Sequence, residues 1–141
     1  DRNGFAFDTL QMPLNVLDAH HDSFEKKVLP VAVQKGMGVL GMKPMGDGLI
    51  LEAKAASAVE CLRYAMSVPG VSVTITGIDS PRVLEQDLKL ARGFRPMTAA
   101  ERDALLARTA AAARGGRWEK YKTAHDFDGT FQNPEWLGPK A

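Results

Sequence analysis

Short apolar stretches alternate along this chain with longer stretches in which apolar residues recur at helical spacing. The short stretches are bounded mainly by glycine, proline or polar residues and predict buried strands. They cover residues 9–15, 39–42 and 71–76. The longer stretches each follow a strand and predict helices. They cover residues 24–35, 52–67 and 81–92. Strand–helix alternation is typical of a parallel sheet with right-handed crossovers, so the predicted fold class is α/β.

Capping residues predict where the helices begin and end. Ser23 and Ser80 precede helical stretches and are expected N-caps. Gly36 suits the left-handed position just after a helix. Pro30 predicts a kink in the first helical stretch, because proline lacks the N–H that an interior helical residue donates. A Thr-x-x-Glu capping box opens one further helix, at residues 98–113.

Three strands are few for a parallel sheet. Such sheets are normally covered on both faces, and exposed strand edges act as templates for aggregation. The pattern therefore predicts a sheet with more strands than this sequence contains. We expect the isolated chain to self-associate or to be partly molten.

A glycine-rich segment, residues 36–48, surrounds the second predicted strand. Gly36, Gly38 and Gly41 match G-x-G-x-x-G, but they lead into a strand instead of following one, so the match to the dinucleotide fingerprint is accidental. After the strand come Lys43 and a glycine-rich turn. The carboxyl ends of parallel strands hold the ligand in such folds, and this turn offers a cation and close backbone approach.

Residues 114–141 form an irregular tail in which glycines and prolines separate aromatic side chains, Phe127 among them. We expect this tail to pack over a larger body or to be partly disordered. The segment 126–130 spells D-x-D-G-T, the nucleophile motif of haloacid-dehalogenase-like phosphatases. That chemistry needs a buried apolar strand before the first Asp, whereas a polar stretch precedes it here, so a surface turn is the better interpretation.

Composition excludes several classes of function. A formal net charge of +1 does not indicate binding to nucleic acid or to an acidic membrane. No apolar stretch is long enough to cross a membrane. The single cysteine, Cys61, fits a reducing compartment, and we expect the cytoplasm. The run His20-His21-Asp22 is better explained as a polar loop than as a metal site, because adjacent residues rarely reach one ion.

The three strand ends carry motifs that resemble the carboxyl-terminal part of an aldo-keto reductase. They are Gln11-Met12-Pro13-Leu14-Asn15, Gly41-Met42-Lys43-Pro44-Met45-Gly46-Asp47-Gly48 and Thr76-Gly77-Ile78-Asp79-Ser80-Pro81-Arg82. The tail, with Gly115-Gly116-Arg117-Trp118 and Asn133-Pro134-Glu135-Trp136, resembles a bacterial branch of the family. The resemblance implies an eight-stranded TIM barrel, (β/α)8, that transfers hydride from a nicotinamide nucleotide to an aldehyde or ketone. Residues 1–113 would be its strands six to eight with the following helix, and residues 114–141 its tail.

The resemblance also implies a cofactor site. Its residues would be Gln11, Met42, Lys43, Met45, Gly46, Gly48, Gly77, Asp79, Ser80, Arg82, Gln86 and Asp87. Gln11 and Met42 would contact the nicotinamide, and the loop 43–48 would wrap the pyrophosphate. Residues 77–82 would take the adenosine-side phosphate, and the pair 86–87 would contact adenine. The implied cofactor is NADP, with NAD possible because Asp79 repels a 2′-phosphate.

The proton-donating Tyr of that family, with its Lys, Asp and His partners, comes from the first half of the barrel. That half is not in this sequence, and Tyr64 and Tyr121 do not lie at strand ends, so no catalytic residue is nominated. We expect the chain to be inactive alone and to need the missing amino-terminal half and a small carbonyl substrate. The alternative is a non-catalytic nucleotide-binding or interaction module derived from this fold.

Overall fold

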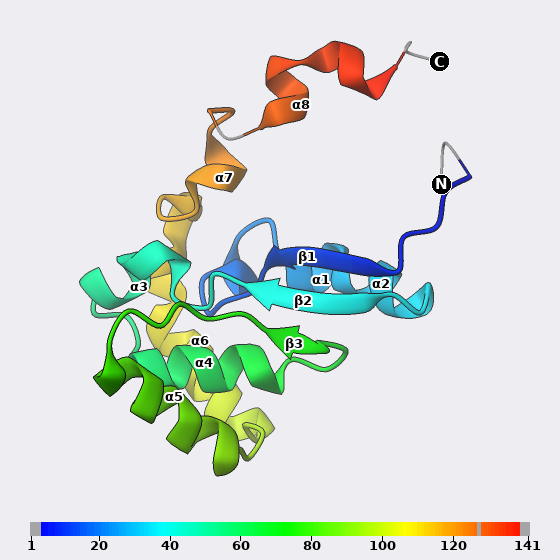
Figure 1. Ribbon diagram of the computed structural model, residues 1–141. Coiled ribbons are helices and arrows are strands. Elements are labelled where there is room, and N and C mark those ends of the chain that lie inside the picture. The colour runs from blue at the N-terminus through cyan, green and yellow to red at the C-terminus, as the bar shows by residue number, and fades with distance from the viewer. Residues whose placement is uncertain (1–3, 127, 139–141) are drawn as a thin grey trace.

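The computed structural model describes residues 4–126 and 128–138, so Phe127 lies outside the described residues. Its centre is a parallel sheet of three strands in the order β1-β2-β3 (Figure 1). The strands are β1 (Thr9–Pro13), β2 (Gly38–Met42) and β3 (Val73–Thr74). Gln11 pairs with Leu40, and Leu40 pairs with Val73. The predicted α/β class with parallel strands is confirmed.

Helices follow each strand. The first six are α1 (Phe24–Lys27), α2 (Leu29–Gln34), α3 (Leu49–Glu52), α4 (Ala58–Ser67), α5 (Pro81–Arg92) and α6 (Ala99–Ala113). The tail adds α7 (Lys120–Thr123) and α8 (Gly129–Gln132). Single turns of 3₁₀ helix are η1 (Asp18–His20), η2 (Gly46–Gly48), η3 (Arg114–Gly116) and η4 (Pro134–Leu137). None of the helices within residues 4–126 and 128–138 has the length and apolar character that crossing a bilayer requires.

Local capping chemistry fixes the helix starts as expected. Ser23 accepts a hydrogen bond from the Lys26 amide, 3.2 Å away, and Ser80 accepts one from the Val83 amide, 3.3 Å away. The capping box that begins α6 is present. The predicted kink at Pro30 is a full break, because α1 ends at Lys27 and α2 begins at Leu29 with the proline in its first turn.

Three predicted boundaries are wrong. The strand expected over residues 9–15 ends at Pro13. The helix expected over residues 52–67 begins only at Ala58, because Ser57 and Glu60 form a capping box that starts α4 there. Glu52 is instead the last residue of α3, and Lys54 after it has a left-handed φ of 51°. The strand expected over residues 71–76 pairs only as Val73–Thr74. The flanking amides of Ser72 and Ile75 still bond β2 carbonyls, at 2.8 Å each, so the segment runs alongside β2 without a full ladder.

One face of the sheet is buried and the other is open. Met12 and Val39 point to the buried face and are 3% and 0% exposed. They join a core cluster with residues of η1, α2, α4 and α6. The row Gln11, Leu40 and Val73 points to the opposite face, where Gln11 is exposed and Val73 is 51% exposed. Among the described residues, the sheet is thus covered on one face only, whereas parallel sheets are normally covered on both.

The tail leads away from the sheet after α6, and α8 lies at the far end of the molecule (Figure 1). Its side chains Phe131 and Trp136 are 59% and 67% exposed. In contrast, the α7 region is anchored to the loop after β1 by buried charged side chains, which are described below. The tail therefore has an anchored first part and an exposed second part.

Candidate functional site

An open cleft lies where β2 and β3 end, between the loop 43–48 and the start of α5. Its volume is about 840 Å³, within the range of ligand pockets. All three strands point toward this end of the molecule, where α3 and the first turn of α5 also lie (Figure 1). The cleft thus occupies the carboxyl edge of a parallel sheet, the usual ligand position in such folds.

Most of the residues nominated from the sequence line this cleft. They are Met42, Lys43, Met45, Gly48, Gly77, Asp79, Arg82, Gln86 and Asp87. Sequence reasoning missed other lining residues, namely Pro44, Asp47, Leu51, Ala58, Ile75, Thr76, Ile78 and Val83. Asp47 lies inside the nominated loop, so its position was a usable signal. Ala58 had none, because it was placed in the interior of a longer helix.

Three nominated residues do not line the cleft but support residues that do. The Gln11 side-chain amide donates to the Met42 sulfur, 3.1 Å away. Ser80 caps α5. Gly46 is buried, and a β-carbon added there would lie 3.3 Å from the Ile50 side chain. These residues hold the walls of the cleft in position.

The loop 43–48 has an unusual backbone. Lys43 and Asp47, both non-glycine residues, have φ of 52° and 58°, and Gly48 has a φ of 89°. Such conformations cost energy in non-glycine residues and often occur at functional sites. Lys43 and Asp47 form an ion pair across the turn, and the Gly46 amide donates to the Lys43 carbonyl, 2.9 Å away. The loop is therefore closed on itself by its own polar groups.

The opposite wall begins at Gly77. This residue has no positive φ, and a β-carbon added there would meet no atom within 4 Å. The described chain thus gives no steric or conformational reason for glycine at position 77. A few residues later α5 begins with Pro81, and Arg82 lies exposed in its first turn. Backbone amides at a helix amino end and a guanidinium together suit an anionic group.

Two residues that line the cleft each have a buried polar atom without a hydrogen-bond partner among the described residues. The Thr76 hydroxyl and Asp87 Oδ2 are buried and have no hydrogen-bond partner among the described residues. The other carboxylate oxygen of Asp87 accepts from the Gln86 side-chain amide at 3.2 Å. Buried acceptors of this kind are costly unless they are satisfied. They leave hydrogen-bonding capacity on residues that line the cleft.

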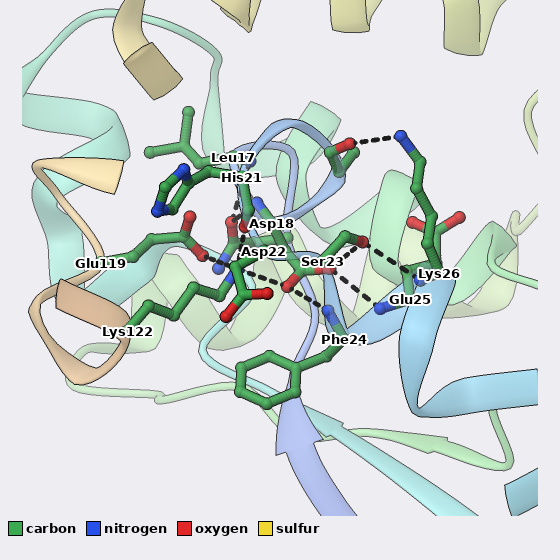
Figure 2. Close-up of polar contacts among 12 residues, drawn as sticks. Leu17, Asp18, His21, Asp22, Ser23, Phe24, Glu25, Lys26, Glu119 and Lys122 are labelled. Carbon is green, nitrogen blue, oxygen red and sulfur yellow. Dashed lines mark hydrogen bonds and ion pairs between the residues drawn. The ribbon is translucent and has the colours of Figure 1, made fainter. Parts of the chain in front are cut away.

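A second polar cluster, unforeseen from the sequence, lies away from the cleft. Figure 2 shows Lys122 of α7 between Asp18 of η1 and Glu119. The Lys122 ammonium lies 2.7 Å from Asp18 Oδ1, 2.9 Å from Glu119 Oε1 and 2.8 Å from the His21 carbonyl. The Lys122 and Asp18 side chains are 1% and 0% exposed. Asp18 also accepts from Ser23 and from the amides of the first turn of α1. We call Asp18, Glu119 and Lys122 the buried ion cluster.

Neither tyrosine is placed to act on a ligand in the cleft. The Tyr64 hydroxyl donates to Glu25 at 2.6 Å, and the Tyr121 hydroxyl donates to Glu119 at 2.8 Å. Burial and the neighbouring carboxylates raise the pKa of both phenols well above the ordinary value. No tyrosine or histidine lines the cleft within the described part of the chain.

The remaining motifs take structural positions. Asp128 of the D-x-D-G-T segment caps α8, accepting from the amides of Thr130 and Phe131 at 3.1 and 3.0 Å. The Thr130 hydroxyl also donates to it, and these hydrogen bonds lower the pKa of the Asp128 carboxyl. The His20 ring lies 3.1 Å from the Thr109 hydroxyl. Cys61 is fully buried.

Comparison with known proteins adds no assignment. No protein-family model matches this sequence. No curated protein matches it either. The functional interpretation therefore depends on the cleft and on the motifs that line it.

Proposed function

We propose that this chain is the nucleotide-binding part of an NAD(P)-dependent oxidoreductase of the aldo-keto reductase type. In this proposal β1, β2 and β3 are strands six to eight of a (β/α)8 TIM barrel. The observation that supports this proposal best is that two separately nominated segments line the same cleft. Segments 42–48 and 77–87, nominated separately from the sequence, form two walls of one cleft at the carboxyl edge of the sheet.

The chemistry of the cleft suits a dinucleotide. Arg82 and the amino end of α5 would receive the adenosine-side phosphate, and the strained loop around Lys43 would wrap the pyrophosphate. Gln11 and Met42 would hold the nicotinamide ring at the sheet. The open space beside Gly77 would admit the ligand close to the backbone. The nicotinamide, once bound, supplies the hydride for reduction of a small aldehyde or ketone.

Proton donation would come from elsewhere, because the described lining of the cleft contains no tyrosine or histidine. The open face of the sheet supports a requirement for further strands, which we propose are the missing amino-terminal half of the barrel. The free, buried Cys61 is consistent with a reducing compartment such as the cytoplasm.

The test is direct binding of NADH and NADPH to the full chain, measured by calorimetry. Arg82→Gln removes the proposed phosphate contact, and we expect it to weaken binding by about 10- to 100-fold, the usual worth of a charge-assisted hydrogen bond. Arg92→Gln, at the other end of the same helix and outside the cleft, is the matched control and should leave the Kd unchanged. Equal effects of the two substitutions would reject the site.

The second candidate is a nucleotide-binding module without catalysis, since the described lining of the cleft offers walls for a nucleotide and no tyrosine or histidine. Both candidates predict binding, and they differ in turnover once the amino-terminal half is supplied. The oxidoreductase requires that the chain alone leave a test aldehyde unreduced and that the reassembled barrel reduce it. Binding without turnover in the reassembled barrel would favour the module.

A further inference from the structure

We propose that a second pocket of this chain binds a phosphate group, carried by a small molecule. The pocket has a volume of about 550 Å³, within the range of ligand pockets. It is lined by residues 53–57 between α3 and α4, by the second half of α6 and by the start of the tail. Its described lining shares no residue with that of the cleft. We call it the basic pocket after its three cations, Lys54, Arg108 and Arg117.

Glu60 is the one carboxylate in the described lining of the basic pocket, and both of its oxygens are already bonded. Its Oε2 accepts from the Ser57 amide at 2.9 Å and from the Ser57 hydroxyl at 2.8 Å. Its Oε1 accepts from the Arg108 guanidinium at 2.6 Å. Arg108, followed by the capping contacts, lowers the pKa of Glu60 to about 2, so Glu60 is ionised at neutral pH. One carboxylate thus balances one of the three cations, and two positive charges remain.

The other two cations have no carboxylate partner. Lys54 and Arg117 are both exposed and form no ion pair with any residue in the described ranges. The Arg117 guanidinium lies over the Trp118 ring, 4.8 Å from its centre. Such a contact positions the guanidinium and leaves its N–H donors without an oxygen acceptor. Arg117 is therefore held in place with its charge available to a ligand.

The backbone at Lys54 supports the same site independently. Lys54 has a φ of 51°, in the left-handed region that costs energy for a residue with a β-carbon. Glycine or asparagine adopts this conformation at lower cost, so the turn itself does not require lysine. Strained residues of this kind often occur where a ligand is held. Here the strained residue contributes a cation to the lining.

A phosphate group fits these charges. It carries about −1.5 to −2 charges at pH 7, which matches the two unbalanced cations. A guanidinium binds two phosphate oxygens at once, and an ammonium adds a point charge. Much of the remaining lining is alanine, whose small side chain leaves room beside the phosphate for the rest of a small ester. These residues are Ala53, Ala55, Ala56, Ala111 and Ala112.

Calorimetry of the full chain with inorganic phosphate, glucose 6-phosphate and glucose tests this proposal. We expect both phosphate compounds to bind with a Kd of about 1 mM or below at low salt and more weakly at high salt, and glucose not to bind. Tighter binding of glucose 6-phosphate would identify an ester as the ligand, whereas equal or weaker binding of it would identify free phosphate.

Two substitutions locate the phosphate. Arg117→Gln and Lys54→Gln should each weaken its binding about tenfold, as expected for loss of a charge-assisted hydrogen bond. Lys54→Gln, in an exposed turn, supplies the test if thermal unfolding shows that Arg117→Gln is not folded. Arg114→Gln removes an exposed cation of η3 that does not line the pocket, and this matched control should leave the Kd within about twofold.

Three results would overturn the basic pocket as a phosphate site. The first is absence of binding by either phosphate compound. The second is equal weakening by Arg114→Gln and Arg117→Gln, which would indicate attraction to positive charge in general. The third is weakening by Arg82→Gln alone, which would place the phosphate in the cleft and leave the proposed function standing.

Discussion

Replacing Lys122 with methionine removes the cation from the buried ion cluster while keeping a side chain of similar length. The ammonium is bonded to Asp18, Glu119 and the His21 carbonyl, and its side chain is 1% exposed. Its loss leaves two carboxylates buried without their counter-ion. Removing one partner of a buried ion pair costs about 3–5 kcal/mol, because the remaining charge stays desolvated. That loss is a large part of the free energy of unfolding of a typical domain, which is about 5–15 kcal/mol.

Thermal and urea unfolding of the full chain measure this loss. For a chain of this size, about 3–5 kcal/mol corresponds to a fall in Tm of about 10–15 °C. Lys120→Met, on an exposed residue of the same helix α7, is the matched control and should change stability by no more than about 0.5 kcal/mol. If Lys122→Met lost less than about 1 kcal/mol, the cluster would not be the anchor that Figure 2 indicates.

Three further predictions follow from single positions. Gly77→Ala should stabilise the chain by about 0.4–1 kcal/mol in thermal unfolding, since position 77 has no positive φ and an added β-carbon would meet no neighbour. Gly48→Ala, at a φ of 89°, should instead destabilise it by about 1–2 kcal/mol. Destabilisation by both substitutions would contradict this reasoning. Burial raises the pKa of the Cys61 thiol to about 12, so iodoacetamide at mild alkaline pH should label native protein at least about 100-fold more slowly than urea-unfolded protein, and equal rates would refute the burial. The Arg63 side chain, followed by the capping contacts, lowers the pKa of Glu101 from 4.5 to about 2, so its stabilising effect is present above pH 4.5 and is lost as pH falls toward 2. Glu101→Gln should therefore flatten the acid limb of the urea midpoint against pH, and an unchanged limb would count against the pairing.

Sequence reasoning predicted the parts of the fold that depend on local chemistry. The caps at Ser23 and Ser80 each join a side chain to an amide three residues away, so a short window contains both partners. The helix expected over residues 52–67 failed for the same reason. High helix propensity suggested one continuous element, while the capping box at Ser57 and Glu60 required a new start.

What could not be predicted depends on partners far apart in the chain. In the sequence, residues 119–122 look like a polar segment of the tail. Lys122 is nevertheless buried, because its ammonium bonds the carboxylate of Asp18, 104 positions earlier in the chain. The shortness of β3 is likewise a property of the sheet, since no further strand within residues 4–126 and 128–138 pairs with its free edge in the order β1-β2-β3. Motifs in the sequence predicted which segments form the walls of the cleft. The ion pair between Lys43 and Asp47 could not be predicted in this way, because it depends on the conformation of the folded loop.

The separation of Asp18 from Lys122 has a consequence for biosynthesis. At translation rates of about 5–20 residues per second, the 104 positions between them take about 5–20 s to synthesise. Throughout that interval the Asp18 carboxylate, which is buried in the folded chain, has no Lys122 ammonium to pair with. The η1 turn is thus expected to stay hydrated until α7 has left the ribosome. Docking of α7 against η1 is then a late step of folding.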